Sequence, residues 1–221
     1  QKIITKSGNV FILLCLLVAN SGSIQVTQAA AGDIVRVSVS SSGAQGSGQS
    51  QFSSISADGR YVAFQSDADN LVSGDTNEAT DIFVRDTVTN TTTRVSVNSS
   101  GVEGNNDSGS GFKSSISANG RYVAFTSGSN NLVSGDTNGT TTDVFVRDTV
   151  TNTTTRVSVD SGGMEGNNGS FAPSISTDGR YIAFDSDANN LVSGDTNGTT
   201  DVFVRDTVTN TTTRVSVDSN S

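Results

Sequence analysis

The chain has 221 residues, of which 13 are lysine or arginine and 22 are aspartate or glutamate, so its formal charge is −9. A nucleic-acid partner would require a basic face, and this acidic balance argues against one. Histidine is absent and Cys15 is the one cysteine, so the chain lacks the residues for a Ser-His-Asp triad, a Cys-His pair or a zinc cluster. We therefore predict no catalytic residue and a protein that is not an enzyme. A hydrolase that uses carboxylates alone is the remaining catalytic alternative.

Residues 1–31 resemble a secretory signal segment. Two lysines precede an apolar run at 10–19, and three alanines at 29–31 follow as the small residues of a cleavage site. A stable membrane anchor needs about 20 apolar residues, and this run is shorter. We therefore expect a secreted, extracellular protein, with the periplasm as second choice, cleaved after the alanines or, as the alternative, after Ser21.

The rest of the chain contains three near-identical copies of one unit. The sequence SISADGRYVAF at 54–64 returns with small changes at 115–125 and 174–184, so the copies start 61 and 59 residues apart. In each copy a second shared sequence, NLVSGDTN, follows and leads into a run that ends in TTTRVSV. A period of about sixty residues indicates stacked supersecondary units, either a propeller or a solenoid.

Each copy predicts four antiparallel strands. In the first copy a short strand at 53–56 meets the second through Asp58-Gly59, a dipeptide typical of β-hairpin turns. The second strand, 61–64, and the third, 81–84, are apolar on both faces, so we expect them to lie between other layers. The fourth, 93–97, alternates like a half-exposed outer strand. This gradient predicts a propeller blade that runs from axis to rim, and the hairpin turns argue against a parallel β-helix.

We therefore predict an all-β protein with one β-propeller domain at 32–221, made of tandem four-stranded blades at 51–97, 112–159 and 171–217. Residues 33–39 (DIVRVSV) repeat a fourth-strand sequence without its first three strands, which predicts an orphan outer strand. About four to eight blades close a propeller. We expect either that the chain continues into further blades or that several chains combine, with the orphan strand added to a neighbour's sheet.

This pattern resembles the WD40-like repeats of the TolB-type β-propeller superfamily. Blades of that superfamily have a DG turn, an apolar IAF strand and a D-I/V-Y/F-V-x-D strand, and this chain has DGRYVAF and DIFVRD in the matching places. The resemblance covers nearly all of 33–217 and implies a propeller fold, protein partners in the periplasm and no catalytic residue. The chain departs from the family in a longer loop between the second and third strands.

That loop carries the pattern G-D-T-N-x-x-x-D, with one more residue in the second copy. Oxygen ligands at alternate positions followed by a later aspartate are typical of Ca²⁺ sites, and the pattern resembles the calcium loops of integrin-type propeller blades. The predicted calcium ligands are Asp75, Asn77, Asp81, Asp136, Asn138, Asp143, Asp195, Asn197 and Asp201. The alternative is that these side chains only form Asx turns that stabilise the loop.

Near-identical blades with surfaces rich in threonine and serine favour packing of one molecule on another over a single asymmetric active site. We predict a non-enzymatic structural or adhesive module of the cell exterior, self-associating and calcium-stabilised, with further copies or a cell-surface or matrix protein or glycan as partners. The alternative is a monomeric TolB-like recognition propeller that binds a protein, peptide or glycan at one mouth of its channel. No nucleic-acid partner and no stable membrane anchor are expected.

Overall fold

The structure is a computed structural model that describes residues 34–109 and 111–218, and these residues form β-strands and no helix. The strands are β1 (Ser50–Ile55), β2 (Tyr61–Ser66), β3 (Asp81–Asp86), β4 (Thr91–Arg94), β5 (Ser115–Ile116), β6 (Tyr122–Ser127), β7 (Asp143–Asp148), β8 (Thr153–Arg156), β9 (Ser170–Ile175), β10 (Tyr181–Ser186), β11 (Asp201–Asp206) and β12 (Thr211–Arg214). They form three four-stranded antiparallel sheets, each in chain order. The predicted all-β fold of three four-stranded blades is confirmed. No helix that could cross a membrane occurs among these residues, and the predicted signal segment at 1–31 lies outside them.

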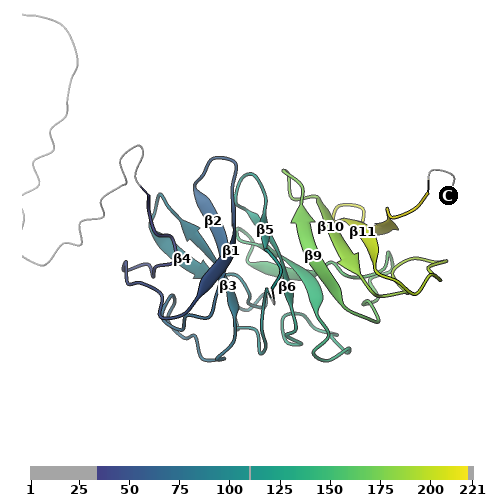
Figure 1. Cartoon of the computed structure of the whole chain (residues 1–221), viewed down its shortest axis with the longest axis horizontal. Helices are drawn as coiled ribbons and strands as arrows, with labels where there is room; N and C mark the ends of the chain where they lie inside the picture. The colour runs from purple at the N-terminus through teal and green to yellow at the C-terminus, as the bar shows by residue number, and fades with distance from the viewer. Residues whose placement is uncertain (1–33, 110, 219–221) are drawn as a thin grey trace, which may run out of the picture.

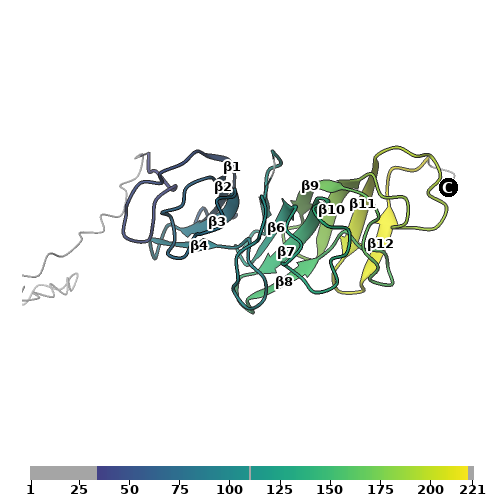
Figure 2. The same ribbon diagram turned by 90° about the horizontal axis from the view of Figure 1, so that it is seen from below.

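The three sheets stand side by side in an arc, from the blue sheet through the teal one to the green and yellow one (Figure 1). Figure 2 shows β4, β8 and β12 along the outer side of this arc. The first strands of neighbouring blades contact one another, β1 with β5 and β5 with β9. The first strands therefore lie nearest the axis and the fourth strands at the rim, as the hydrophobic gradient of each copy predicts.

The core lies between the blades because the second and third strands of the first and second blades are buried on both faces, whereas β10 and β11 of the third blade alternate between buried and more exposed residues. In the first blade Phe64 stacks on Phe83, with ring centroids 5.9 Å apart, and the other two blades repeat the pair. Apolar residues of one blade pack on those of the next, such as Ile82 and Val95 of the first blade with Phe125 of the second. A blade of this kind buries its inner strands only when a neighbour covers it.

Residues 34–39 differ from the expectation of an orphan outer strand. Within the described residues, 34–38 belong to no strand, and Val39 forms only an isolated bridge with Gln45. A fourth strand needs a third strand beside it, and none lies beside these residues. The chain binds the outer edge of β4 at Val39 and Ser41 instead: Thr92 Oγ1 donates to the Val39 carbonyl (2.5 Å) and Thr92 N–H donates to Ser41 Oγ (2.9 Å).

Candidate functional site

The acidic residues of the long loop meet around an arginine. Asp81 is the first residue of β3, its side chain is fully buried, and its Oδ1 accepts a hydrogen bond from Ser96 Oγ (2.5 Å). Arg94, the last residue of β4, places Nη1 2.9 Å from Asp81 Oδ2 and 3.1 Å from Asp75 Oδ1. Its Nη2 lies 2.6 Å from Glu103 Oε2. One guanidinium therefore binds three carboxylates, which we call the Arg94 cluster.

Asn77 contributes N–H groups to this cluster. Its Nδ2 donates to Asp81 Oδ2 (3.2 Å) and to the Gly104 carbonyl (2.8 Å). Its Oδ1 accepts from Ala79 N–H (3.0 Å), which closes an Asx turn. The turn that was the alternative to calcium binding is therefore present in this loop.

The second blade repeats the Arg94 cluster and the third repeats it in part. Arg156 lies 3.3 Å from Asp143, 3.4 Å from Asp136 and 2.7 Å from Glu165. In the third blade Arg214 lies 3.0 Å from Asp195 and 3.3 Å from Asp201, and its side chain is 21% exposed, against 8% for Arg94. No glutamate joins Arg214 within the described residues. Asn138 and Asn197 occupy the same place as Asn77 and donate to Asp143 and Asp201.

Sequence reasoning did not identify the arginine or the glutamate of this cluster. The glutamates come from the connector that leads to the next blade, where V-E-G-N-N and M-E-G-N-N occur in the two internal connectors. The arginine is part of the TTTRVSV run, whose pattern indicates only a strand. The arginine and the glutamate are both visible in the sequence, but they are distant from the loop along the chain, so the sequence does not show that they contact it.

Burial and charge act in opposite directions on the acids of the Arg94 cluster. Burial raises the pKa of both Asp75 and Asp81 and outweighs the stabilising charge of Arg94. Burial also opposes ionisation of Glu103, but the hydrogen bonds from Thr76 and the charge and hydrogen bond of Arg94 together outweigh it, so the pKa of Glu103 is lowered. Three carboxylates face one guanidinium, so the cluster carries excess negative charge whenever all three are ionised.

The geometry allows a metal ion only in place of the arginine. Asp75, Asp81 and Glu103 each offer an oxygen within 4.8 Å of the others, so together they could hold a cation. Calcium requires oxygen ligands at about 2.3–2.6 Å. The guanidinium of Arg94 already lies within 3.1 Å of one oxygen of each acid, so an ion at the centre of the cluster would have to displace it.

A second ion pair joins the hairpin turn of each blade to its third strand. Arg60 donates from Nε and Nη2 to the two carboxylate oxygens of Asp86 (3.0 and 2.7 Å), and its guanidinium lies over the Tyr61 ring. These hydrogen bonds hold the pKa of Asp86 well below its usual range. The adjacent Arg85 does not pair with Asp86 but donates to the Ser40 carbonyl (3.1 Å), which fastens the connector to the blade.

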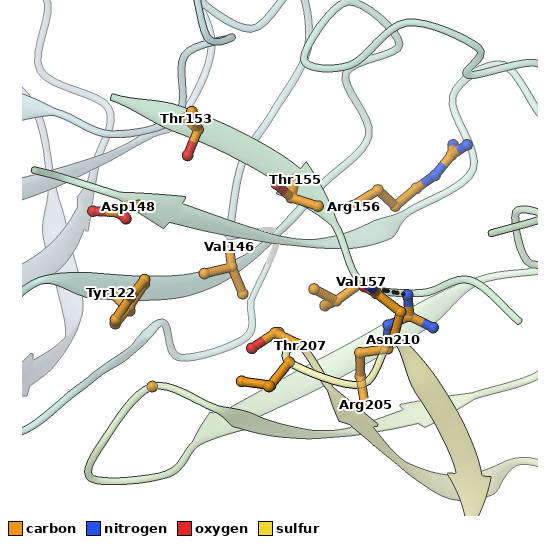
Figure 3. Close-up of a pocket in the computed structure, with 12 residues that line it drawn as sticks. Tyr122, Val146, Asp148, Thr153, Thr155, Arg156, Val157, Arg205, Thr207 and Asn210 are labelled. Carbon is orange, nitrogen blue, oxygen red and sulfur yellow. Dashed lines mark hydrogen bonds between the residues drawn. The ribbon is translucent and has the colours of Figure 1, made fainter. Parts of the chain in front are cut away.

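A groove lies between neighbouring blades near the rim. It encloses about 410 Å³ between the second and third blades and about 270 Å³ between the first and second. Figure 3 shows Thr155 and Val157 of one blade on one side of the larger groove, and Thr207 and Arg205 of the next blade on the other. Equivalent side chains line both grooves: Tyr122, Asp148, Thr153, Thr155, Arg205, Val208 and Asn210 in the larger, and Tyr61, Asp86, Thr91, Thr93, Arg147, Val150 and Asn152 in the smaller.

The outer strand beside each groove has part of its free edge already occupied. Thr154 of β8 donates its N–H to Ser99 Oγ (3.0 Å), and its carbonyl accepts from the same hydroxyl (3.5 Å). Ser41 makes the same pair of contacts with Thr92 of β4. A ligand strand therefore cannot pair with the backbone at this position, and a molecule in the groove would be recognised by side chains.

Comparisons with known proteins show similarity of fold. No family model matches the chain, and no curated protein matches it. Among solved structures, TolB from Acinetobacter baumannii is 18% identical over 77% of this chain and 33% of that chain, with a TM-score of 0.47. The β-propeller domain of the Trilobed protease from Pyrococcus furiosus is 12% identical over 75% of this chain and 41% of that chain, with a TM-score of 0.45. The chain thus spans less than half the length of either structure.

The comparisons contradict the prediction that this protein is not an enzyme. Similar solved structures include peptidases, namely the tricorn protease, a prolyl endopeptidase and acylaminoacyl peptidases, of which this chain covers between 14% and 23% of the length. In such matches the similarity concerns a propeller within a longer enzyme. The absence of histidine restricts the chemistry of these 221 residues and does not exclude membership of an enzyme.

Proposed function

We propose that this chain is a recognition module of β-propeller blades that binds a protein, peptide or glycan partner in the grooves between its blades. The signal-like segment at 1–31 favours a place of action outside the cytoplasm. The observation that carries the proposal is the repetition of one groove at both internal blade boundaries, with matching residues in equivalent positions. A pocket between packed elements with a few convergent polar groups is a typical ligand site.

The grooves combine exposed hydroxyl groups with apolar surface. Thr153 and Thr155 of β8 are exposed and line the larger groove, together with the half-buried ring of Tyr122. Val208, at the turn between β11 and β12, is 68% exposed and lines the same groove. Hydroxyls supply hydrogen bonds, and the ring and the valine supply apolar contact. This combination suits a polar chain with some apolar substituents, such as a peptide segment or a glycan.

The test fills the grooves without changing the core. Thr93 and Thr155 are exposed, so the double variant Thr93→Tyr/Thr155→Tyr should fold normally and occlude both grooves. The matched control is Thr199→Tyr, which changes an exposed loop threonine away from the grooves. Each protein is applied to an immobilised glycan panel and to a displayed peptide library. We expect the wild type and the control to bind the same members and the double variant to lose them. Binding that persists with both grooves filled would refute the proposal.

Self-association is a second hypothesis, which the exposed apolar side chains on the outward faces of the first and third blades favour. Tyr181 and Val215 of the third blade are 41% and 48% exposed, and Ile55 of the first blade is 60% exposed. Calcium stabilisation of the wild-type chain is not favoured by this geometry, because a cation would compete with Arg94 for the acids of the Arg94 cluster.

A further inference from the structure

The connectors that enter the second and third blades share one local geometry at an asparagine. In their sequences, E-G-N-N-D-S and E-G-N-N-G-S, Asn106 and Asn168 occupy the same position. The N–H of Asp107 donates to Oδ1 of Asn106 (2.9 Å), and the N–H of Gly169 donates to Oδ1 of Asn168 (2.9 Å). In both connectors the backbone nitrogen of the next residue therefore lies against the carboxamide of the asparagine.

The two connectors differ in the residue that carries this nitrogen. A side chain on the next residue, as on Asp107, obstructs an approach of its nitrogen to the carboxamide, whereas Gly169 has no side chain and leaves Asn168 accessible to it. The packing of the third blade favours glycine at this position, since an added Cβ would lie 2.3 Å from the Phe171 ring. That ring is itself stacked on Phe112, with centroids 5.3 Å apart. The fold therefore favours an Asn-Gly sequence in this connector.

The carboxamide of Asn168 is also less restrained than those of the other Asn-Gly pairs, which lie at 119–120, 138–139 and 197–198. Asn168 is exposed, and its Nδ2 makes no hydrogen bond to a residue that the structure describes. Each of the other three carboxamides makes two hydrogen bonds with other parts of the chain: Asn119 accepts from Ser117 Oγ and Arg121 N–H, Asn138 donates to Asp143 and to the Gly166 carbonyl, and Asn197 donates to Asp201 and accepts from Thr199 N–H. These bonds must break before the carboxamide can turn toward its glycine nitrogen.

We infer that Asn168 is a site of deamidation in the folded protein. The Gly169 nitrogen gives up its proton to water and bonds to Cγ of Asn168. The bond from Cγ to Nδ2 breaks, and ammonia leaves after it has taken a proton from water, which closes a succinimide ring. Water then opens the ring at either carbonyl and gives aspartate or isoaspartate. The reaction needs only water, and its first step is favoured because both reacting groups are already held together.

Isoaspartate at this position changes the boundary between the second and third blades. It lengthens the main chain by a methylene group just before β9, where the backbone is fixed on both sides of the boundary. The Gly169 carbonyl accepts from Asp187 N–H (2.9 Å), and Ser170 N–H donates to the Thr142 carbonyl of the second blade (2.8 Å). The longer main chain cannot keep both hydrogen bonds in their present geometry, so the modified protein should melt at a lower temperature.

The test incubates the 221-residue chain in mildly alkaline buffer, once folded and once unfolded in urea. Peptide mapping by mass spectrometry follows each Asn-Gly pair, and enzymatic methylation detects isoaspartate. In the unfolded chain we expect all the pairs to react at similar rates. In the folded chain Asn168 should react about tenfold or more faster than the other three asparagines, because each of those must first break two hydrogen bonds.

The equivalent connector supplies a matched variant. Asp107→Gly gives Asn106 a glycine neighbour in the same geometry, so Asn106 should then also react in the folded protein. Asn168→Gln is the control for stability, because its longer side chain closes the corresponding ring poorly. During incubation the melting temperature of the wild type should fall, and that of Asn168→Gln should not.

Two results would overturn the inference. One is a folded wild-type chain in which Asn168 reacts no faster than the other three Asn-Gly pairs. The other is an Asp107→Gly protein in which Asn106 stays intact while Asn168 reacts, because the shared geometry would then not be the cause. The groove proposal does not depend on this outcome, since Asn168 lines neither groove.

Discussion

Replacing Arg94 by methionine tests whether an arginine, rather than an ion, holds the acidic loop in place. The substitution keeps an unbranched apolar stem and removes the guanidinium whose charge binds Asp75, Asp81 and Glu103. Because the side chains of Arg94, Asp75 and Asp81 are 8%, 5% and 0% exposed, water cannot replace the lost partner. The variant is left with buried carboxylates that have no cation.

The size of the effect follows from this burial. Removing one partner of a buried ion pair costs about 3–5 kcal/mol. In a chain of this length each kcal/mol lowers the melting temperature by about 2–4 °C, so Arg94→Met should melt about 6–20 °C below the wild type. Arg214→Met is the matched control, because Arg214 is 21% exposed and binds two aspartates without a glutamate. Its cost should be about 1–2 kcal/mol, between the values for buried and exposed pairs.

The assay is thermal and urea unfolding followed by circular dichroism. Arg156→Met should reproduce the loss seen for Arg94→Met, since Arg156 binds the same three kinds of acid with the same burial. Equal losses for Arg94→Met and Arg214→Met would refute the argument from burial. An Arg94→Met variant as stable as the wild type would show that the arginine has no stabilising role in the loop.

Two further predictions concern calcium and pH. Chelation should leave the melting temperature of the wild type unchanged, because Arg94 occupies the centre of its cluster. Added calcium should raise the melting temperature of Arg94→Met, in which that centre is free. A lower melting temperature of the wild type on chelation would show that an ion binds despite the arginine. The pKa of Asp86 is lowered by Arg60 from its usual 3.8, so its contribution to stability is present above that value and is lost as the pH falls through the folded-state pKa. Burial raises the pKa of Asp81, so this carboxyl has the opposite effect on stability. It favours the folded state at a pH below its usual pKa of 3.8. Below about pH 4 the urea midpoint should therefore fall less steeply with decreasing pH in Asp86→Asn than in the wild type. An unchanged slope would exclude the pair of Arg60 and Asp86 as a source of acid sensitivity.

The sequence alone determined the blade. The DG turns, the doubly apolar strands and the alternating fourth strand are local signals, because a hairpin turn and the burial pattern of a strand depend on residues a few positions apart. Their repetition three times established the number of blades and the order of strands from axis to rim. The same local reasoning predicted an outer strand at 33–39, but of the residues that the structure describes 34–38 belong to no strand, because a fourth-strand sequence forms a strand only where a third strand lies beside it.

Only the tertiary structure decided what the acidic loop binds. Asp75 and Asp81 precede a strand, Arg94 ends the next strand, and Glu103 lies beyond it in the connector, so their meeting depends on how the sheet folds the chain back on itself. Carboxylate oxygens attract a guanidinium and a calcium ion for the same electrostatic reason, and a sequence pattern of acids does not say which cation is near. The contact between Tyr61 and Gly120 is likewise invisible in the sequence, since the two residues belong to different copies of the repeat. Contacts between residues far apart in the chain are set by the packing of whole blades.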